Sequence, residues 1–227
     1  MPPRAHPFGP LSTTRYVVND VRFDMVRVPP GRFVDGEGVE KRALLVSRPF
    51  EIGMTLVTQA LWRAVTGASP SNMEGDDLPV EQVSWVDVQA FLGQLDALGL
   101  RGFRLPTEAE WAWAARCGST ARWAGADRVK PVAVVNQSWP KSVGSLRSST
   151  VGAFDFSGNM REYQSDWWSS VPAVGVDAQG PASGSCGVDR GGSWYSFPKF
   201  MRIAYRGNFN PAHRISILGL RLLRAAS

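Results

Sequence analysis

Cysteine and histidine are scarce in this sequence, and each shortage excludes a class of site. Two cysteines, Cys117 and Cys186, cannot build a disulfide framework, and neither lies in a CxxC motif. We interpret them as unpaired core residues, although a single bridge between them stays open. The two histidines, His6 and His213, are too few for a zinc or iron site that needs several imidazoles.

Apolar runs are also short, and none approaches the roughly 18 residues that a membrane span needs. We therefore expect no transmembrane helix. The N-terminal stretch "MPPRAHPFGPLSTT" lacks the apolar core of a signal peptide. It predicts a proline-rich arm over residues 1–15, with the folded part of the chain beginning at residue 16.

Lysine is rare, so the net charge of +5 comes almost entirely from arginine. The basic residues form neither a run nor a helical stripe, which disfavours nucleic-acid binding. No nucleotide-binding or nucleophile-elbow motif occurs either.

What the chain does contain is enough apolar material for a sizeable core. Hydrophobic residues make up 44% of it, and nine residues are tryptophan. Rough alternation over residues 16–33, broken at Pro29-Pro30-Gly31, predicts two strands joined at a turn. Residues 42–54 predict a second pair of strands.

Three helices are expected from their end signals. Thr58 is placed to cap the first, which Gly67 would end. Ser84 and Asp87 form a capping box for the second, which Gly99 would end. Thr107 begins a T-x-x-E box for the third, and Gly118 stands just past its end.

After residue 118 the pattern changes to short segments and long loops rich in Trp, Gly and Ser. No linker and no repeat of 20–50 residues separates the parts. The sequence therefore predicts one α+β domain over residues 16–227, with the helices early and an irregular second half.

Six segments resemble, in order, the formylglycine-generating-enzyme family, also called the sulfatase-modifying-factor domain. They cover about residues 16–224 and read "VTQALWRAV", "LPVEQVSWVDVQAF", "FRLPTEAEWAWAARCG", "VGSLRSSTVGAFDFSGNMREY", "DRGGSW" and "LGLRLLR". The resemblance implies a C-type lectin fold of this family's type, with a small mixed sheet, two to three helices and much irregular backbone. Because one fold hosts many sites, it does not by itself give the function.

Both enzymatic branches of that family carry chemistry that this chain lacks. The resemblance implies a pair of cysteines shortly after the "GGSW" motif in the cysteine oxidases, where thiolates suit Cu(I). Residues 194–221 contain no cysteine, and the histidines are too few for the iron-dependent branch. We therefore expect no catalytic residues and no required cofactor. A copper-dependent oxidase, or a diverged relative of one, remains the alternative.

A narrower resemblance is to the variable proteins of diversity-generating retroelements, which end in the same frame and are rewritten at adenines of Asn-type codons between the frame positions. The variable region would be residues 194–221. Its frame would comprise Trp194, Pro198, Arg202, Ala204, Arg206, Pro211, Arg214, Leu218, Gly219 and Arg221. The candidate variable, ligand-binding residues are Tyr195, Ser196, Phe197, Lys199, Phe200, Tyr205, Gly207, Asn208, Phe209, Asn210, Ala212, His213, Ile215, Ser216 and Ile217.

The genetic code offers a check on this interpretation. Changing one or both adenines of an Asn codon that ends in a pyrimidine reaches every residue type among the candidates except that of Lys199. Glu, Gln, Met and Trp cannot be reached, and none stands at a candidate position.

The frame and candidate residues have different physical roles. Frame arginines can hold irregular backbone through forked hydrogen bonds to carbonyls and carboxylates, and Trp194 supplies a buried anchor. The candidates are rich in Tyr, Ser, Gly and Asn, as paratopes are. With Tyr195, Phe197, Phe200, Tyr205 and Phe209 exposed together they would form an apolar contact patch. Packing of single rings in the core stays open.

The expected partner is a macromolecule, either a protein or a glycan on a surface. The sequence leaves the location open. Display on a virion, or on a cell surface through another component, fits such a partner.

"DFSGNMREY" matches a family segment that holds calcium in some members. By position the resemblance implies Asp155, Gly158, Met160 and Glu162 as ligands. The alternative is that Asp155 and Glu162 pair with frame arginines. Glu108, Glu110, Asp166 and Asp189 could suggest paired carboxylates for acid–base chemistry, but capping and arginine pairing account for them more simply.

Overall fold

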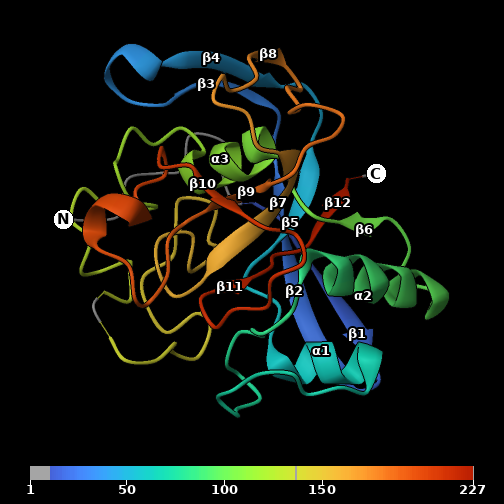
Figure 1. Cartoon of the computed structure of the whole chain (residues 1–227). Helices are drawn as coiled ribbons and strands as arrows, with labels where there is room; N and C mark the ends of the chain where they lie inside the picture. The colour runs from blue at the N-terminus through green and yellow to red at the C-terminus, as the bar shows by residue number, and fades with distance from the viewer. Residues whose placement is uncertain (1–10, 136, 227) are drawn as a thin grey trace.

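Three helices and three small sheets make up the fold in the computed structural model, which describes residues 11–135 and 137–226 (Figure 1). The helices are α1 (Gln59–Thr66), α2 (Trp85–Ala97) and α3 (Glu108–Arg116). Two 3-10 helices are η1 (Gly38–Glu40) and η2 (Pro198–Met201). None of the described helices has the length and apolar character that a bilayer crossing requires.

The largest sheet brings the two ends of the described chain together. Its strand order is β1-β2-β5-β12-β6, and all its pairs are antiparallel. Its strands are β1 (Thr13–Val18), β2 (Val21–Val28), β5 (Phe50–Gly53), β6 (Phe103–Arg104) and β12 (Leu223–Ala225). Leu223 of β12 pairs with Ile52 on one side and Arg104 on the other, so the end of the chain closes this sheet.

The other two sheets are mixed. One has the order β10-β9-β7-β11, with β11 parallel to β7. The other has the order β3-β4-β8, with β8 parallel to β4. Their strands are β3 (Gly31–Asp35), β4 (Arg42–Val46), β7 (Arg161–Trp167), β8 (Gly175–Val176), β9 (Gly187–Arg190), β10 (Gly207–Phe209) and β11 (Leu218–Gly219). Mixed sheets with three helices confirm the expected α+β class.

The strand predictions near the N-terminus were right in kind and wrong in detail. Residues 16–33 belong to three strands, because a turn at Asn19-Asp20 with both φ angles positive joins β1 to β2. The break at Pro29-Pro30 leads instead from one sheet to another. Likewise, β4 and β5 do not pair with each other, since β4 joins β3 while β5 joins β2. Strand β1 begins at Thr13, inside the expected arm, and residues 1–10 of that arm lie outside the described residues.

The helix-end predictions are confirmed. Thr58 Oγ1 accepts from the backbone N–H of Leu61, and Gly67 ends α1 in the left-handed conformation. Both capping boxes form, at Ser84 with Asp87 and at Thr107 with Glu110. These local signals depend on residues three positions apart, which explains why the sequence reveals them.

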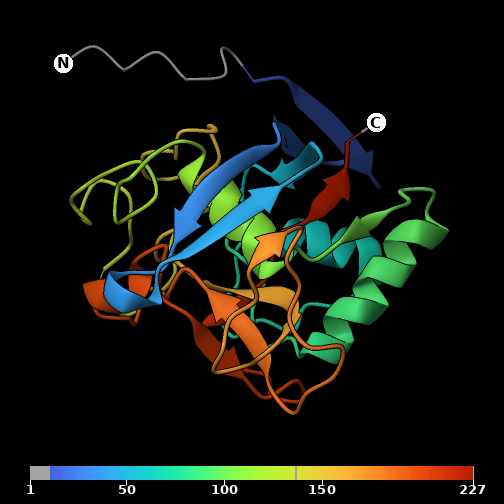
Figure 2. The same ribbon diagram turned by 90° about the horizontal axis from the view of Figure 1, so that it is seen from above.

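Two apolar clusters make up the main core. One lies under α1 and α2 and includes Trp62, Phe91 and Leu95. The other surrounds α3 and includes the fully buried Trp111. Helix α2 and the irregular chain that follows α3 lie on opposite sides of the molecule in both views (Figures 1 and 2). The C-terminal segment from residue 194 extends from the region of the irregular chain to the region of α2.

Candidate functional site

The C-terminal segment, residues 194–221, is tied down first at Trp194. The backbone N–H of Trp194 donates to the carbonyl of Asn159 at 2.8 Å. Its indole Nε1 donates to the carbonyl of Ser216 at 3.3 Å. Because Ser216 is 22 residues further along the chain, this one side chain joins the beginning of the segment to its end.

Arg206 holds the middle of the segment. Its Nε and Nη2 donate to the two carboxylate oxygens of Glu108 at 2.6 and 3.0 Å. Its Nη1 donates to the carbonyl of Ser169 at 2.9 Å, and the guanidinium lies 4.5 Å from the ring centroid of Trp168. All three nitrogens of this planar group donate, which fixes its orientation.

Glu108 and Arg206 belong to a larger buried arginine cluster that also contains Asp35, Arg42, Arg116 and Arg190. Arg190 of β9 is fully buried and donates to the carbonyl of Ile203 at 2.5 Å. Burial raises the pKa of Glu108, but the fields of Arg190, Arg206 and Arg42 outweigh it and lower that pKa to about 2. The carboxylate therefore stays ionised and anchors the backbone from Ile203 to Arg206.

Arg221 anchors the end of the segment through a second buried pair. Its Nε and Nη2 donate to the two oxygens of Glu162 at 2.9 and 2.8 Å, and neither side chain is exposed. The same guanidinium donates to the carbonyls of Gly53 and Phe154. A charge buried this deeply needs such complete pairing.

The pairing of Arg221 with Glu162 affects the calcium site expected from the sequence. Of the four residues expected as ligands, Glu162 has both carboxylate oxygens bound to Arg221, and one of them also accepts from Trp111 Nε1. Asp155 accepts the backbone N–H of Gly144, and burial raises its pKa. A calcium ion would have to displace the guanidinium of Arg221, so the donor set does not fit the ion as it stands. Calcium at Asp155, Gly158, Met160 and Glu162 stays a prediction from sequence.

Two further arginines hold the outer turns of the segment. Arg202 pairs with Glu37 and donates to the carbonyl of Lys199. Arg214 binds both oxygens of Asp87, at 2.7 Å each, and this hydrogen bonding lowers the pKa of Asp87 well below its usual range. Asp87 is also the capping residue of α2, so the segment is attached to the end of that helix.

Most of the fifteen candidate variable positions reach solvent. Among the aromatic candidates, Tyr195 is 73% exposed and Phe197 is 67% exposed. The other exposed positions are Lys199, Asn208, Asn210, Ala212 and His213. Half-buried positions are Ser196, Phe200, Tyr205, Ile215, Ser216 and Ile217. Only Gly207 and Phe209 are buried.

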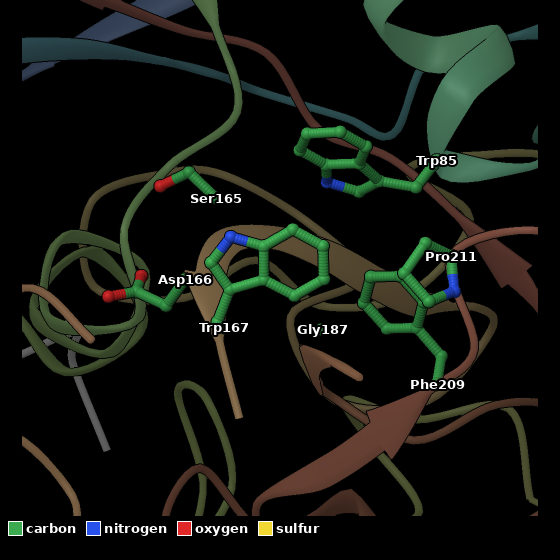
Figure 3. Close-up of a pocket in the computed structure, with 7 residues that line it drawn as sticks. All are labelled: Trp85, Ser165, Asp166, Trp167, Gly187, Phe209 and Pro211. Carbon is green, nitrogen blue, oxygen red and sulfur yellow. The ribbon is translucent and has the colours of Figure 1, made fainter. Parts of the chain in front are cut away.

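The expected exposure of Phe209 is wrong. Its side chain is 5% exposed and packs edge-on against Tyr163, with ring centroids 4.6 Å apart. A narrow crevice beside it is lined by Trp85, Trp167 and Pro211 (Figure 3). Gly187 makes this position available, because any side chain there would overlap the Phe209 ring. Phe209 therefore packs β10 against β7 and is not displayed on the surface.

Gly207 is closely packed as well. A Cβ at this residue would overlap the carboxylate of Asp189 and the guanidinium of Arg161, which pair at 2.8 Å. Asn208, between these two buried residues, points outward in the alternation of the strand. The same alternation that hides Gly207 and Phe209 thus displays Asn208.

Trp139, an exposed aromatic residue outside the segment, was missed from sequence. Trp139 is 58% exposed, and the backbone N–H of Gln137 donates to the carbonyl of Trp194. Asn159, which accepts from Trp194, also bonds both backbone groups of Lys141 through its side chain. The residues from Gln137 to Lys141 are thus held beside the start of the segment. A lone Trp in the polar stretch "QSWPKS" was the available signal.

Of the remaining reactive groups, the carboxylates have structural partners and Cys117 is buried, whereas Cys186 is half-buried, so the expected core position holds for Cys117 alone. Asp166 accepts the backbone N–H of Glu108 at 2.6 Å, and Asp189 pairs with Arg161. Both cysteines are free thiols, and burial raises the pKa of Cys117 to about 12. Over residues 11–135 and 137–226, no group of three or more His, Cys, Asp or Glu could hold a metal ion.

Comparison with known proteins agrees with this geometry. The sequence model of the "Sulfatase-modifying factor enzyme 1-like domain" matches residues 16–226. Treponema denticola variable protein 1 superposes with a TM-score of 0.87 and 29% identity, over 94% of this chain and 99% of that one. The fold is therefore the C-type lectin fold of the formylglycine-generating-enzyme type, and the resemblance to variable proteins is confirmed.

Two curated relatives represent other branches. The chaperone protein LppX of Paenibacillus barcinonensis is 25% identical over 89% of each chain. The formylglycine-generating enzyme of Streptomyces coelicolor is 32% identical over 73% of this chain, and the match spans 58% of that enzyme's length.

Proposed function

The chain belongs to the sulfatase-modifying factor enzyme 1-like domain family, and we propose that it is a non-catalytic, ligand-binding variable protein. Its binding face is formed by the exposed residues of the C-terminal segment. The observation that carries this proposal is the separation of two sets of residues within one stretch. Arg206, Gly207 and Phe209 are anchored or buried, while Asn208 and Asn210 beside them are exposed.

This separation supports a surface that tolerates exchange. Backbone held by buried ion pairs does not depend on the side chains it displays, much as a sandwich scaffold supports variable loops. We define the display face as Tyr195, Phe197, Asn208, Asn210, Ala212 and His213. Its large rings and small polar groups are the residue types of adaptable paratopes.

We further propose that a retroelement diversifies the display face. All six of its residues can be reached from an Asn codon by changes at adenine. Gly207 and Phe209 are reachable too, but they cannot vary without strain or a cavity. Lys199 is exposed and unreachable, so we assign it to the constant part of the chain.

The proposed partner is a protein displayed on a surface, with a glycan as the alternative that binding experiments would separate. Tyr195 and Phe197 would be the main anchors, since aromatic side chains dominate the energetics of interfaces. Trp139 would contribute a third aromatic ring that no rewriting of residues 194–221 changes. Display on a virion or through another cell-surface component would allow several copies to bind together.

A second candidate function is oxidation of a protein cysteine, because the curated relatives include a formylglycine-generating enzyme. An assay with a thiol-containing peptide, dioxygen and added Cu(I) tests it directly. We expect no turnover, since Cys117 and Cys186 both lie outside residues 194–221. Copper-dependent formation of an aldehyde would make the enzyme the better description.

The proposed function is tested by selection. A library randomised at the six display-face positions is selected against lysozyme as a test ligand, alongside a library randomised at Arg206, Gly207 and Phe209. We expect folded binders from the first library alone. Failure of the first library to yield soluble binders would overturn the proposal. In the genome, a near-copy of the codons for residues 194–221 beside a reverse transcriptase gene is the expected companion.

A further inference from the structure

A groove of about 550 Å³ lies between α1, the chain from Ala68 to Asn72, and α2. This volume falls within the range of ordinary ligand sites. None of the display-face residues lines the groove, but Arg214 of the C-terminal segment forms part of its wall. No function considered so far makes use of it.

The apolar part of the groove is rigid. Trp62 and Phe91 stack with their ring centroids 4.8 Å apart and their planes within 3° of parallel. They are 4% and 0% exposed, and Val83 beside them is equally buried. These buried rings support the groove from below, and the apolar side chains that a ligand can reach are those of Ala68, Pro70 and Ala90.

The polar part of the groove offers unused hydrogen-bonding groups. Its three side-chain amides are those of Asn72, Gln82 and Gln94. None of the three carboxamides makes a hydrogen bond within the described parts of the chain, although their backbones do. The one charged pair in the wall is Asp87 with Arg214, which sums to no net charge. The lining thus favours an uncharged ligand that presents both donors and acceptors.

The groove is continuous with the C-terminal segment. Gln82 adopts a left-handed φ of 59°, a conformation that is unfavourable for a residue other than glycine. In this conformation its N–H donates to the carbonyl of Ile215 at 3.2 Å. Together with the pair of Arg214 and Asp87, this bond holds the turn that carries Ala212 and His213 at the edge of the groove. A single ligand could contact both.

We propose that the groove is a constant binding site for an extended, uncharged peptide segment. An apolar side chain would pack against Ala68, Pro70 and Ala90, the apolar lining residues that are not buried. The carboxamides of Asn72, Gln82 and Gln94 would pair with backbone N–H and C=O groups, whose donor and acceptor spacing they match. The proposal rests on the proposed function only in taking the partner to be a protein.

A sugar fits the groove less well. Recognition of a sugar by stacking needs an open aromatic face, whereas Trp62 and Phe91 stack on each other and are buried. A side-chain carboxamide, in contrast, matches a peptide group directly. The absence of an unpaired charge in the lining also argues against an acidic or basic segment.

The test uses the full chain and an acetylated, amidated tetraleucine peptide as the probe. Chemical shifts of backbone amides and of the Trp62 indole N–H are followed up to about 10 mM peptide, a range suited to weak fragment binding. We expect saturable shifts confined to α1, α2, residues 66–83 and the turn around Arg214. Methyl glucoside at the same concentrations should leave these signals unchanged.

Two substitutions on α2 serve as a matched pair. Ala90→Trp fills the groove from an exposed helix position, whereas Gln89→Trp adds the same ring on a face that does not line it. We expect Ala90→Trp to weaken peptide binding by at least about tenfold, and Gln89→Trp to leave it unchanged. The proposal is overturned if the peptide causes no shifts, if methyl glucoside binds in its place, or if both variants behave alike. Each of these outcomes leaves the library selection on the display face unaffected.

Discussion

The helical region from Thr58 to Arg116 and the C-terminal segment are both well fixed, but by different means. The helices are held by local caps and by burial of their apolar side chains, which covers one face of α1 and α2 and almost every side of α3. The C-terminal segment has little regular structure and is held by arginines whose partners lie up to 168 residues away. Rigidity therefore does not require regular secondary structure, and side chains outside the anchoring contacts are left free for display.

Two glutamates in the first turn of α3 should show the largest difference between the two kinds of anchoring. Glu108 serves the C-terminal segment through Arg206 and Arg190, while Glu110 serves the helix through its capping box. Glu108→Ala should lower the free energy of unfolding by about 3–5 kcal/mol, because it leaves buried guanidinium groups unpaired. Glu110→Ala should cost only about 1–2 kcal/mol. Urea unfolding of both variants measures the difference, and equal losses would contradict it.

The pH dependence of stability tests the role of Glu108 further. The pKa of Glu108 is depressed from 4.5 to about 2 in the folded state. The stabilisation of the folded state by the ionised Glu108 carboxylate is therefore complete above pH 4.5 and is lost as the pH falls toward 2. The loss amounts to about 3 kcal/mol. Glu108→Gln should show a correspondingly shallower fall in stability between pH 5 and pH 2, measured by urea unfolding.

That experiment should compare the free energies of unfolding of wild type and Glu108→Gln at each pH. Burial raises the pKa of Asp189 to about 6, against the fields of Arg161 and Arg190. Asp189 therefore favours the folded state increasingly as the pH falls from 6 toward 4. This effect is common to both proteins and cancels. Parallel curves for wild type and Glu108→Gln would show that Glu108 does not carry the acid sensitivity.

Two glycine-to-alanine substitutions, one in each region, should change stability by smaller amounts and with opposite signs. Gly207→Ala forces Asp189 and Arg161 apart and should destabilise the protein by about 1–3 kcal/mol. Gly93→Ala, on the exposed face of α2 where a Cβ meets nothing within 4 Å, should stabilise it by up to about 1 kcal/mol. Thermal unfolding of the two variants checks the signs. A harmless Gly207→Ala would return residue 207 to the variable set.

Added calcium should have the smallest effect on thermal stability. Since Arg221 occupies both oxygens of Glu162, we expect the midpoint of thermal unfolding to be the same in excess Ca²⁺ and in excess chelator. A saturable increase with Ca²⁺, removed by Asp155→Ala, would instead support the ion site that the sequence resemblance implies.

The sequence predicted those features that depend on nearby residues or on a specific motif. The caps at Thr58, Ser84 and Thr107 are of this kind, and the motifs led to the right fold. The burial of Phe209 was not predictable, because it depends on the missing side chain of Gly187 in a neighbouring strand.

Trp139 was missed for a similar reason. Its place beside Trp194 depends on the hydrogen bond from Gln137 and on the side chain of Asn159. Neither contact leaves a pattern in the sequence. Residues far apart in the chain therefore decide which aromatic rings are displayed and which are packed.

The most direct test sets five changes on the display face against one change beneath it. The five simultaneous substitutions are Tyr195→Ser, Phe197→Asn, Asn208→Tyr, Ala212→Ser and His213→Tyr. Together they should change the free energy of unfolding by less than about 1.5 kcal/mol, whereas Phe209→Ser alone should cost about 3–5 kcal/mol. If the fivefold variant unfolds more easily than the single one, the display face is part of the core and the division between anchored and displayed residues is wrong.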